Sequence, residues 1–284
     1  MGELSGRVAV VTGATRGAGL AIAEVLGAAG ATVYVTGRSA RGLGATEGLP
    51  GTVEGAAERV DAAGGTGVAV RCDHTRPGDV EALFARVDRD GGRLDLLVNN
   101  AWGGYEGYDG RTFDAPFWEQ PLEARWQGMW VAGVRAHLLA SQCAAPRMIR
   151  AGQGLIVSTI AWAFGAYLGN LFYDAAKAAI ARAIFGMGEE LRPHGVTAVA
   201  VAPGFMRTER VLAAHAAAPF DLSGTESPTY LGRAVAALAA DPNVLRHSGQ
   251  LLTAGELARM YGFTDVDGRQ PEQFRLPNVA PFAA

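Results

Sequence analysis

The chain has 284 residues, a formal net charge of −3, and 49% hydrophobic against 19% charged residues, an ordinary composition for a globular protein. No run of basic residues gathers anywhere, so a nucleic acid or a charged membrane surface has no electrostatic support as a partner. The first residues carry no charged-then-apolar leader, and no apolar run approaches about 18 residues, so we expect a cytoplasmic protein without a membrane span.

The predicted elements alternate, in chain order, between short β-branched runs and alanine-rich helical stretches. Strands are predicted within 7–13, 31–37, 67–73, 94–101, 154–159 and 196–204, and helices within 18–30, 53–65, 79–92, 129–148 and 172–191. Such alternation favours β-α-β units, in which helices cover both faces of a parallel sheet. No repeat, linker or composition break divides the chain. We therefore predict one α/β domain over residues 1–284 with a doubly wound parallel sheet.

Three stretches look like additions to that core: residues 39–55, residues 102–120 and the tail 256–284. The second, WGGYEGYDGRTFDAPFWEQ, is rich in aromatic residues. Ligands bind beside the loops that follow strand ends in such sheets. The aromatic stretch is therefore either a wall of a substrate mouth or a surface loop packed by its own rings.

The cysteines and histidines give no pattern for a metal site or a disulfide. Only Cys72 and Cys143 are present, without C-x-x-C spacing, and the five histidines are scattered along the chain. We expect no metal, and we expect both cysteines to be small buried hydrophobic residues.

The first predicted strand runs into TGATRGAG, which places Gly13, Gly17 and Gly19 at the turn into a helix. Glycine lets the backbone turn tightly and approach a pyrophosphate, which the positive end of the following helix stabilises. A glycine-rich turn alone is a weak signal. Its place between the first strand and an alanine-rich helix favours a dinucleotide site.

Five motifs occur in an order that is typical of one known family. The G-x-x-x-G-x-G turn is followed by CD at 72–73, NNA at 99–101, YDAAK at 173–177 and PGFMRT at 203–208. With these motifs the chain resembles the short-chain dehydrogenase/reductases from about residue 5 to residue 255. Residues 133–137 and 261–269 are similar to the branch named after member 1 of that family. The resemblance implies a Rossmann-type fold, a nicotinamide cofactor, a small-molecule substrate and a homodimer or homotetramer.

The resemblance also implies which residues bind the cofactor. Asp73 would meet the adenine amino group, Asn99 and Ala101 would line the adenosine, and the turn after Pro203 would hold the nicotinamide amide. The full set of expected cofactor-binding residues is Gly13, Thr15, Arg16, Gly17, Gly19, Arg38, Ser39, Asp73, Asn99, Ala101, Lys177, Pro203, Gly204, Phe205 and Thr208.

The charge of the residues after the second strand indicates the form of the cofactor. An acid there usually binds a ribose 2′-hydroxyl, whereas a 2′-phosphate needs cations. Gly37 stands where the acid would be, with Arg38 next to it and Arg16 in the glycine turn. We therefore predict NADP(H).

Tyr173 and Lys177 are four residues apart and so lie on one face of a predicted helix. A cation beside a phenol lowers the pKa of the phenol, which lets the tyrosine exchange a proton with a substrate oxygen. We predict Tyr173 as the catalytic acid/base and Lys177 as its support. In the family this lysine also binds the nicotinamide ribose.

Two positions depart from the family pattern. Counting back from Tyr173 gives Ile160 where a serine is usual, and the preceding helix has Gly133 where an asparagine is usual. Neither side chain can donate a hydrogen bond to a substrate or a water.

Polar residues near Ile160 could supply the missing hydrogen-bond donor. Because consecutive strand residues face opposite sides, we expect Thr159 to point away from the site unless a bulge turns it. Ser158 faces the site but lies about 7 Å along the strand. Asn170, three residues before Tyr173, is then the best remaining donor.

The sequence thus predicts an NADP(H)-dependent oxidoreductase that transfers hydride between the cofactor and a carbonyl or secondary alcohol of a bulky hydrophobic substrate. Trp102, after the NNA motif, and Trp162 are expected near that substrate. The two departures keep other hypotheses open. One is a cofactor-binding sensor or scaffold whose catalysis has decayed. The other is an enzyme that uses Tyr173 and Lys177 in a cyclisation, dehydration or isomerisation.

Overall fold

The computed structural model describes residues 2–44, 48–106, 113–163 and 165–272. Within these residues, seven parallel strands form one sheet in the order β3-β2-β1-β4-β5-β6-β7. The strands are β1 (Val8–Val11), β2 (Thr32–Gly37), β3 (Thr66–Arg71), β4 (Leu96–Asn99), β5 (Gly154–Thr159), β6 (Val196–Ala202) and β7 (Leu251–Thr253). The predicted doubly wound parallel sheet is confirmed.

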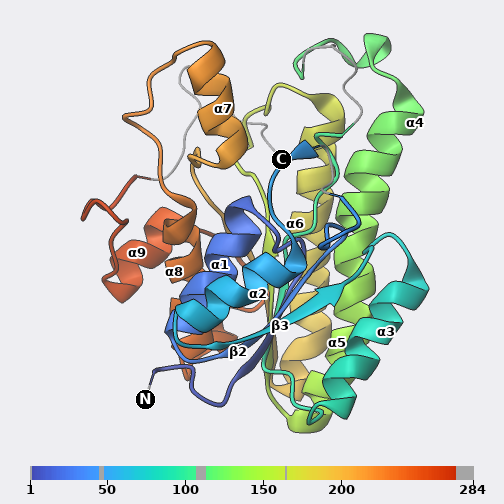
Figure 1. Cartoon of the computed structure of the whole chain (residues 1–284), viewed down its shortest axis with the longest axis vertical. Coiled ribbons are helices and arrows are strands. Elements are labelled where there is room, and N and C mark those ends of the chain that lie inside the picture. Colours follow the sequence, from blue (N-terminus) through green and yellow to red (C-terminus); the bar gives the residue numbers. More distant parts are fainter. Residues whose placement is uncertain (1, 45–47, 107–112, 164, 273–284) are drawn as a thin grey trace.

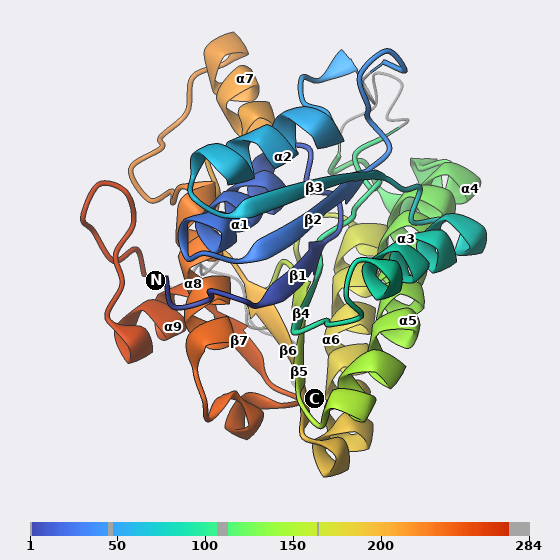
Figure 2. The same ribbon diagram turned by 60° about the horizontal axis from the view of Figure 1, so that its bottom comes forward.

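Helices cover both faces of this sheet, as Figures 1 and 2 show from two directions. One layer contains α1 (Gly17–Ala28), α2 (Val53–Ala62), α8 (Pro228–Ala240) and α9 (Ala254–Tyr261). The other contains α3 (Pro77–Arg89), α5 (Ala136–Ala151) and α6 (Leu171–Leu191). A short α4 (Leu122–Arg125) continues through the π-helix Trp126–Arg135 into α5, and α7 (Glu209–Ala217) lies at the top of Figure 1. Short 3₁₀ turns span Phe117–Glu119, Arg192–His194 and Val244–His247.

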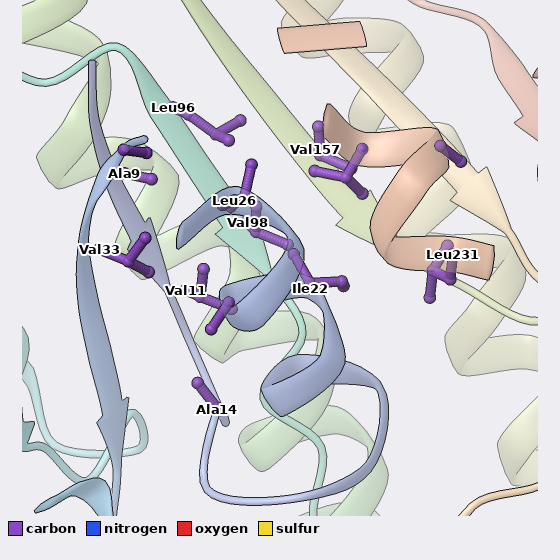
Figure 3. Packing of buried hydrophobic residues seen from close by; sticks show 14 of the residues in the cluster. Ala9, Val11, Ala14, Ile22, Leu26, Val33, Leu96, Val98, Val157 and Leu231 are labelled. Carbon is purple, nitrogen blue, oxygen red and sulfur yellow. The ribbon is translucent and has the colours of Figure 1, made fainter. Parts of the chain in front are cut away.

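The core lies on both sides of the sheet because consecutive strand residues face opposite helical layers. Val11, Val98 and Val157 of three strands meet Ile22 of α1 and Leu231 of α8 in a fully buried cluster (Figure 3). The sequence neighbours of these strand residues face α5 and α6 in a second cluster. Burial on both faces fixes the strand register and so holds the strand ends at one edge.

The strand order reverses at β1, which pairs with β2 on one side and with β4 on the other. In such sheets, ligands bind in the crevice outside the carboxyl ends of the strands at this switch point. α1 begins at Gly17, directly beyond β1, so its N-terminus lies at that crevice.

Residues 256–284 were expected to be an addition to the core, but the first part of this segment belongs to the core itself. α9 begins at Ala254, and the side chains of Thr253 and Glu256 form a capping box over its first turn. Leu257 and Ala258 are fully buried in the core. Residues 273–284 lie outside the described part. No helix in the described ranges is both long and apolar enough to cross a bilayer.

Candidate active site

A cavity of about 660 Å³ opens at the carboxyl ends of the central strands. Small-molecule sites usually have volumes in this range. Most residues predicted from the sequence line it: Gly13, Thr15, Arg16, Gly17, Arg38, Ser39, Asp73, Ala101, Trp102, Thr159, Ile160, Trp162, Tyr173, Lys177, Pro203, Gly204, Phe205 and Thr208. Gly19, Asn99, Ser158 and Asn170 lie outside its lining.

The glycine turn after β1 allows close packing of the chain around it. Gly13 has a φ of +64°, and a Cβ there would lie 2.8 Å from the Cα of Ala101. A Cβ on Gly19 would lie 2.3 Å from the carbonyl oxygen of Gly13. Both positions therefore exclude a side chain. Gly19 serves the packing of α1 against the turn instead of lining the cavity.

Asn100, which we did not predict, ties the glycine turn to the end of β4. Its backbone N–H donates to Oγ1 of Thr12 over 2.8 Å, and its Nδ2 donates to the carbonyl oxygens of Thr12 and Gly13 over 3.1 and 3.0 Å. Asn99, predicted to line the adenosine, is fully buried and donates to Oγ of Ser141 over 2.9 Å. That prediction is wrong because neighbouring strand residues face opposite sides, which turns Asn100 toward the cavity.

Two arginines and a serine lie at the end of the cavity near β2. Nη2 of Arg16 donates to Oγ of Ser39 over 3.0 Å. Arg38 forms an ion pair with Glu106, which comes from the aromatic stretch. The carboxylate of Glu209 accepts a hydrogen bond of 3.2 Å from the backbone N–H of Gly17 at the start of α1. Carboxylate oxygens thus occupy two positions that are suited to anions.

Asp73, which follows β3, also faces the cavity. Its Oδ1 accepts hydrogen bonds from the backbone N–H and the hydroxyl of Thr75, over 3.0 and 2.7 Å. Burial acts to raise the pKa of Asp73, but these hydrogen bonds and the charge of Arg38 outweigh it and lower the pKa. Asp73 is therefore an ionised acceptor at neutral pH.

Tyr173, in the first turn of α6, is surrounded by rings from the aromatic stretch. Trp102 and Phe113 make edge contacts with its ring at centroid distances of 5.5 and 5.3 Å. The ring of Tyr105 lies 6.3 Å from the ring of Tyr173, tilted by 32°. Burial first, and then Tyr105, raise the pKa of Tyr173 well above its ordinary value. The described part of the aromatic stretch therefore forms a wall of the site, which decides between our two interpretations of it.

Lys177, one turn further along α6, is the only lysine in the chain. Its Nζ lies 3.5 Å from the ring centroid of Trp102, in a cation–π contact, and 5.4 Å from that of Tyr173. Burial lowers the pKa of Lys177 to about 7. The expectation that Lys177 lowers the pKa of Tyr173 is not met, because the amine lies on Trp102 and is itself partly neutral at pH 7.

Gly133 departs from the family pattern because Trp102 occupies the space of a side chain there. Gly133 belongs to the π-helix, and a Cβ on it would lie 2.5 Å from Cζ3 of Trp102. The indole therefore lies between this helix and the amine of Lys177. The glycine and the tryptophan are two parts of one structural change.

Gly133→Asn should destabilise the protein by about 1–3 kcal/mol, because the new side chain must displace the partly buried indole of Trp102. Urea unfolding measures the change. Gly186→Asn is the matched control, since Gly186 is also helical and a Cβ there would meet nothing within 4 Å. If the two variants unfold at the same urea concentration, the packing of Trp102 against position 133 is not as described.

The chain turns at the end of β5 and brings two consecutive residues to the cavity. β5 ends at Thr159, and both Thr159 and Ile160 line the cavity. Oγ1 of Thr159 donates to the carbonyl oxygen of Asn99 over 3.4 Å and to Oδ1 of Asn100 over 3.3 Å. The prediction that Thr159 points away is therefore wrong, because strict alternation holds only inside the strand.

Ser158 and Asn170 do not face the substrate side of the cavity. Ser158 is fully buried, and its Oγ has no hydrogen-bond partner among the described residues. Oδ1 of Asn170 accepts from the backbone N–H of Tyr173 over 3.0 Å, and its Nδ2 donates to the carbonyl oxygen of Phe113 over 2.6 Å. Asn170 is thus the N-cap of α6. The structure corrects both predictions of a substrate donor.

The turn after β6 closes the other side of the cavity, with Pro203, Gly204 and Phe205 in its lining. Burial raises the pKa of Glu226 to about 7, although the backbone N–H of Gly204 acts to lower it. A Cβ on Gly204 would lie 2.8 Å from Oε2 of Glu226. Thr208 is the N-cap of α7. This turn is therefore fixed from beneath by a buried carboxyl group.

The cysteines lie apart from the reacting groups. Cys72 is fully buried, and burial raises its pKa to about 12, whereas Cys143 is only half-buried. In the part of the chain that the structure describes, no three histidine, cysteine or acidic side chains gather as a metal site would need.

Comparison with known proteins places this geometry in a family. The family model described as short chain dehydrogenase matches residues 7–217, well over half of the chain. The chain belongs to the short-chain dehydrogenase family.

Relatives of this short-chain dehydrogenase agree with the predicted branch. The mouse and human proteins named dehydrogenase/reductase SDR family member 1 are 40% and 39% identical, and each match covers 95% of this chain and 87% of the relative. A 3-oxoacyl-[acyl-carrier-protein] reductase from Vibrio cholerae is 29% identical, over 92% of this chain and 96% of its own. The structure of a hydroxysteroid dehydrogenase from Escherichia coli has a TM-score of 0.72 at 27% identity, over 88% of this chain and 95% of that one. The predicted family and branch are confirmed.

The cavity residues of this short-chain dehydrogenase that the sequence did not reveal include Asn100, Tyr105 and Glu106. Asn100 could have been found, because the second asparagine of NNA lies just past a strand end. Tyr105 and Glu106 lie in a stretch without periodicity. Its aromatic composition was the only signal there.

Proposed function

We propose that the chain is an NADP(H)-dependent oxidoreductase that transfers hydride between the cofactor and a carbonyl or secondary alcohol of a bulky hydrophobic substrate. The observation that carries this proposal is one cavity that joins the glycine turn to Tyr173 and Lys177. We place the protein in the cytoplasm as a homodimer or homotetramer. The exposed side chains of Leu138 on α5 and Phe185 on α6 support association between subunits, because they offer apolar surface.

The residues around the glycine turn fit a dinucleotide with a 2′-phosphate. Positive φ angles at Gly13 and Gly17 bring the backbone to the cavity at the start of α1. Arg16, Arg38 and Ser39 add two guanidinium groups and a hydroxyl, which suit a phosphate better than a neutral ribose hydroxyl. The carboxylate of Glu106 pairs with Arg38, and that of Glu209 accepts from the N–H of Gly17. Both positions therefore suit the anionic oxygens of a cofactor. When bound, NADPH supplies the hydride.

Tyr173 supplies the proton of the proposed reaction. It donates its hydroxyl proton to the substrate oxygen as hydride reaches the carbonyl carbon, and the resulting phenolate is reprotonated from water. Lys177, which lines the same cavity, would bind the nicotinamide ribose, as the family resemblance implies, and so hold the cofactor beside Tyr173. In the reverse direction the phenolate accepts the proton of an alcohol.

The lining of the cavity indicates the substrate class. Trp102, Tyr105, Phe113, Trp162 and Phe205 all face it, so a bulky apolar body fits beside the reacting groups. Relatives named a 3-oxoacyl-[acyl-carrier-protein] reductase and a hydroxysteroid dehydrogenase agree with exchange between a carbonyl and an alcohol.

The experiment that tests this function incubates the protein with NADPH and ketones of increasing apolar size and follows the nicotinamide absorbance. We expect turnover that rises with the apolar size of the ketone. Tight NADPH binding without any turnover would favour the sensor or scaffold, and conversion of a substrate at constant absorbance would favour the non-redox enzyme. Ile160 and Gly133 are the reason that these two alternatives are kept.

Arg38→Asp should remove a preference for NADPH. In the wild type we expect NADPH to bind at least about tenfold more tightly than NADH, since each charge-assisted hydrogen bond to the 2′-phosphate contributes about 1.5–3 kcal/mol. Calorimetry with both cofactors measures this preference. Arg41→Asp is the control, because Arg41 is paired with Glu58 outside the cavity lining. Equal affinities of the wild type for NADPH and NADH would contradict the assignment.

A further inference from the structure

Tyr105 stands at the mouth of the cavity, on the stretch that follows β4. Its ring lies 6.3 Å from the rings of both Tyr173 and Phe113, and the guanidinium group of Arg210 covers it at 5.2 Å. The residue lines the cavity and remains 39% exposed. The two phenol rings therefore lie close together at the reacting end of the site, and Tyr105 raises the pKa of Tyr173.

The opposite wall of the site brings no hydroxyl to the same place. Ile160 lines the cavity at 3% exposure and packs into the apolar cluster beside α5 and α6. The hydroxyl of Thr159 donates to oxygens at the end of β4, and Ser158 is buried outside the lining. Among the described residues of the cavity lining, Tyr105 is the phenol besides Tyr173, and its ring lies 6.3 Å from the Tyr173 ring.

We propose that Tyr105 is a second catalytic residue, whose hydroxyl donates a hydrogen bond to the same substrate oxygen that Tyr173 protonates. This inference rests on the proposed function and names a residue that the family motifs do not include. Tyr105, on the loop after β4, would take the role of hydrogen-bond donor that a serine at the end of β5 has in the family pattern. A phenol on a loop can reach the oxygen from the mouth of the cavity, so position 160 is left free for an apolar contact with the substrate.

The reaction then proceeds between two hydroxyl groups. A carbonyl oxygen that enters between the two phenols accepts one hydrogen bond from each. As hydride adds to the carbonyl carbon, the π electron pair moves onto the oxygen, and Tyr173 transfers its proton there. Tyr105 keeps its proton, and its hydrogen bond strengthens as charge grows on the oxygen. Burial raises the pKa of Tyr105, so its hydroxyl stays a donor at neutral pH.

The test is a double-mutant cycle of Tyr105→Phe and Ile160→Ser, on the ketone that the wild type reduces best. Tyr105→Phe should lower kcat about 10²-fold, the usual effect of one donor at a developing oxyanion, with the KM for NADPH within about twofold. Ile160→Ser alone should change kcat by less than about threefold, because a donor is already present. In the Tyr105→Phe background the same serine should restore kcat at least about tenfold. Tyr167→Phe is the matched control, since Tyr167 is exposed and outside the lining.

A purely structural role for Tyr105 gives different results. Phenylalanine keeps the ring contacts, so a packing role predicts kcat within about threefold of the wild type, and a serine at position 160 could not repair a packing defect. Either of these results overturns the inference and leaves the proposed function standing. If the wild type reduces no ketone while the protein is folded, the proposed function fails, and the inference fails with it.

Discussion

Tyr173→Phe is expected to lower turnover by about 10²- to 10⁴-fold while the affinity for NADPH stays within about threefold. Phenylalanine keeps the edge contacts with Trp102 and Phe113, at 5.5 and 5.3 Å, and removes only the hydroxyl. The raised pKa of Tyr173 means that the wild type holds this proton at neutral pH and can give it to a substrate oxygen. The variant has no proton to give.

Steady-state kinetics with NADPH and calorimetric titration of NADPH measure the two quantities separately. The control is again Tyr167→Phe, which removes a phenol hydroxyl from an exposed residue outside the cavity. Retention of most turnover by Tyr173→Phe would show that another group supplies the proton. A large loss of NADPH affinity would show that Tyr173 binds the cofactor as well.

Lys177→Met is expected to give an inactive protein that is more stable than the wild type near pH 7. Burial lowers the pKa of Lys177 from its ordinary 10.5 to about 7, so between these pH values the unfolded chain binds a proton that the folded chain does not. The protonated amine therefore costs the folded state stability at and below pH 7, and this cost disappears as the pH rises toward about 10. A shift of this size corresponds to about 5 kcal/mol, part of which the contact with Trp102 offsets.

Urea unfolding of both proteins at a series of pH values measures this effect. The free energy of unfolding of the methionine variant should exceed that of the wild type by about 2–4 kcal/mol near pH 7 and by less than about 1 kcal/mol near pH 10. Arg182→Met, an exposed cation on the same helix, is the control and should show no such dependence on pH. Because the chain has a single lysine, selective isotope labelling of lysine gives one signal whose titration reports the pKa directly. If the difference in free energy of unfolding between the two proteins does not decrease as the pH rises, the low pKa of Lys177 is contradicted.

The fold and the cofactor end of the site could be predicted from the sequence because they depend on regular patterns. Strands that alternate with helices predicted the doubly wound sheet, and the glycines after β1 predicted the close turn that Gly13 now forms. The YDAAK motif predicted that Tyr173 and Lys177 share one face of a helix, and both line the cavity. Periodicity sets which side chains face the same way, and in these segments it holds.

The predictions for the substrate end of the site were wrong where the regular periodicity of the strand stops. Thr159 and Ile160 lie at the end of β5, where the chain bends and strand alternation no longer decides direction. Asn170 could have been recognised as a helix cap, since asparagine three residues before the first-turn tyrosine is a common N-cap spacing. Tyr105 could not be predicted, because its contact with Tyr173 joins a loop to a helix that lies far along the chain.

The π-helix and the loop after β4 affect how the substrate specificity of this protein can evolve. Trp102, Tyr105 and Glu106 reach the cavity from a loop that leaves the sheet at Asn99, whereas the buried strands carry almost none of the groups that would touch a substrate. Insertions and exchanges in such a loop leave the register of the sheet intact. A gene duplicate can therefore acquire a new substrate through this one segment while it inherits the nucleotide pocket unchanged, and position 133 must stay a glycine for as long as the Trp102 ring fills the space beside it.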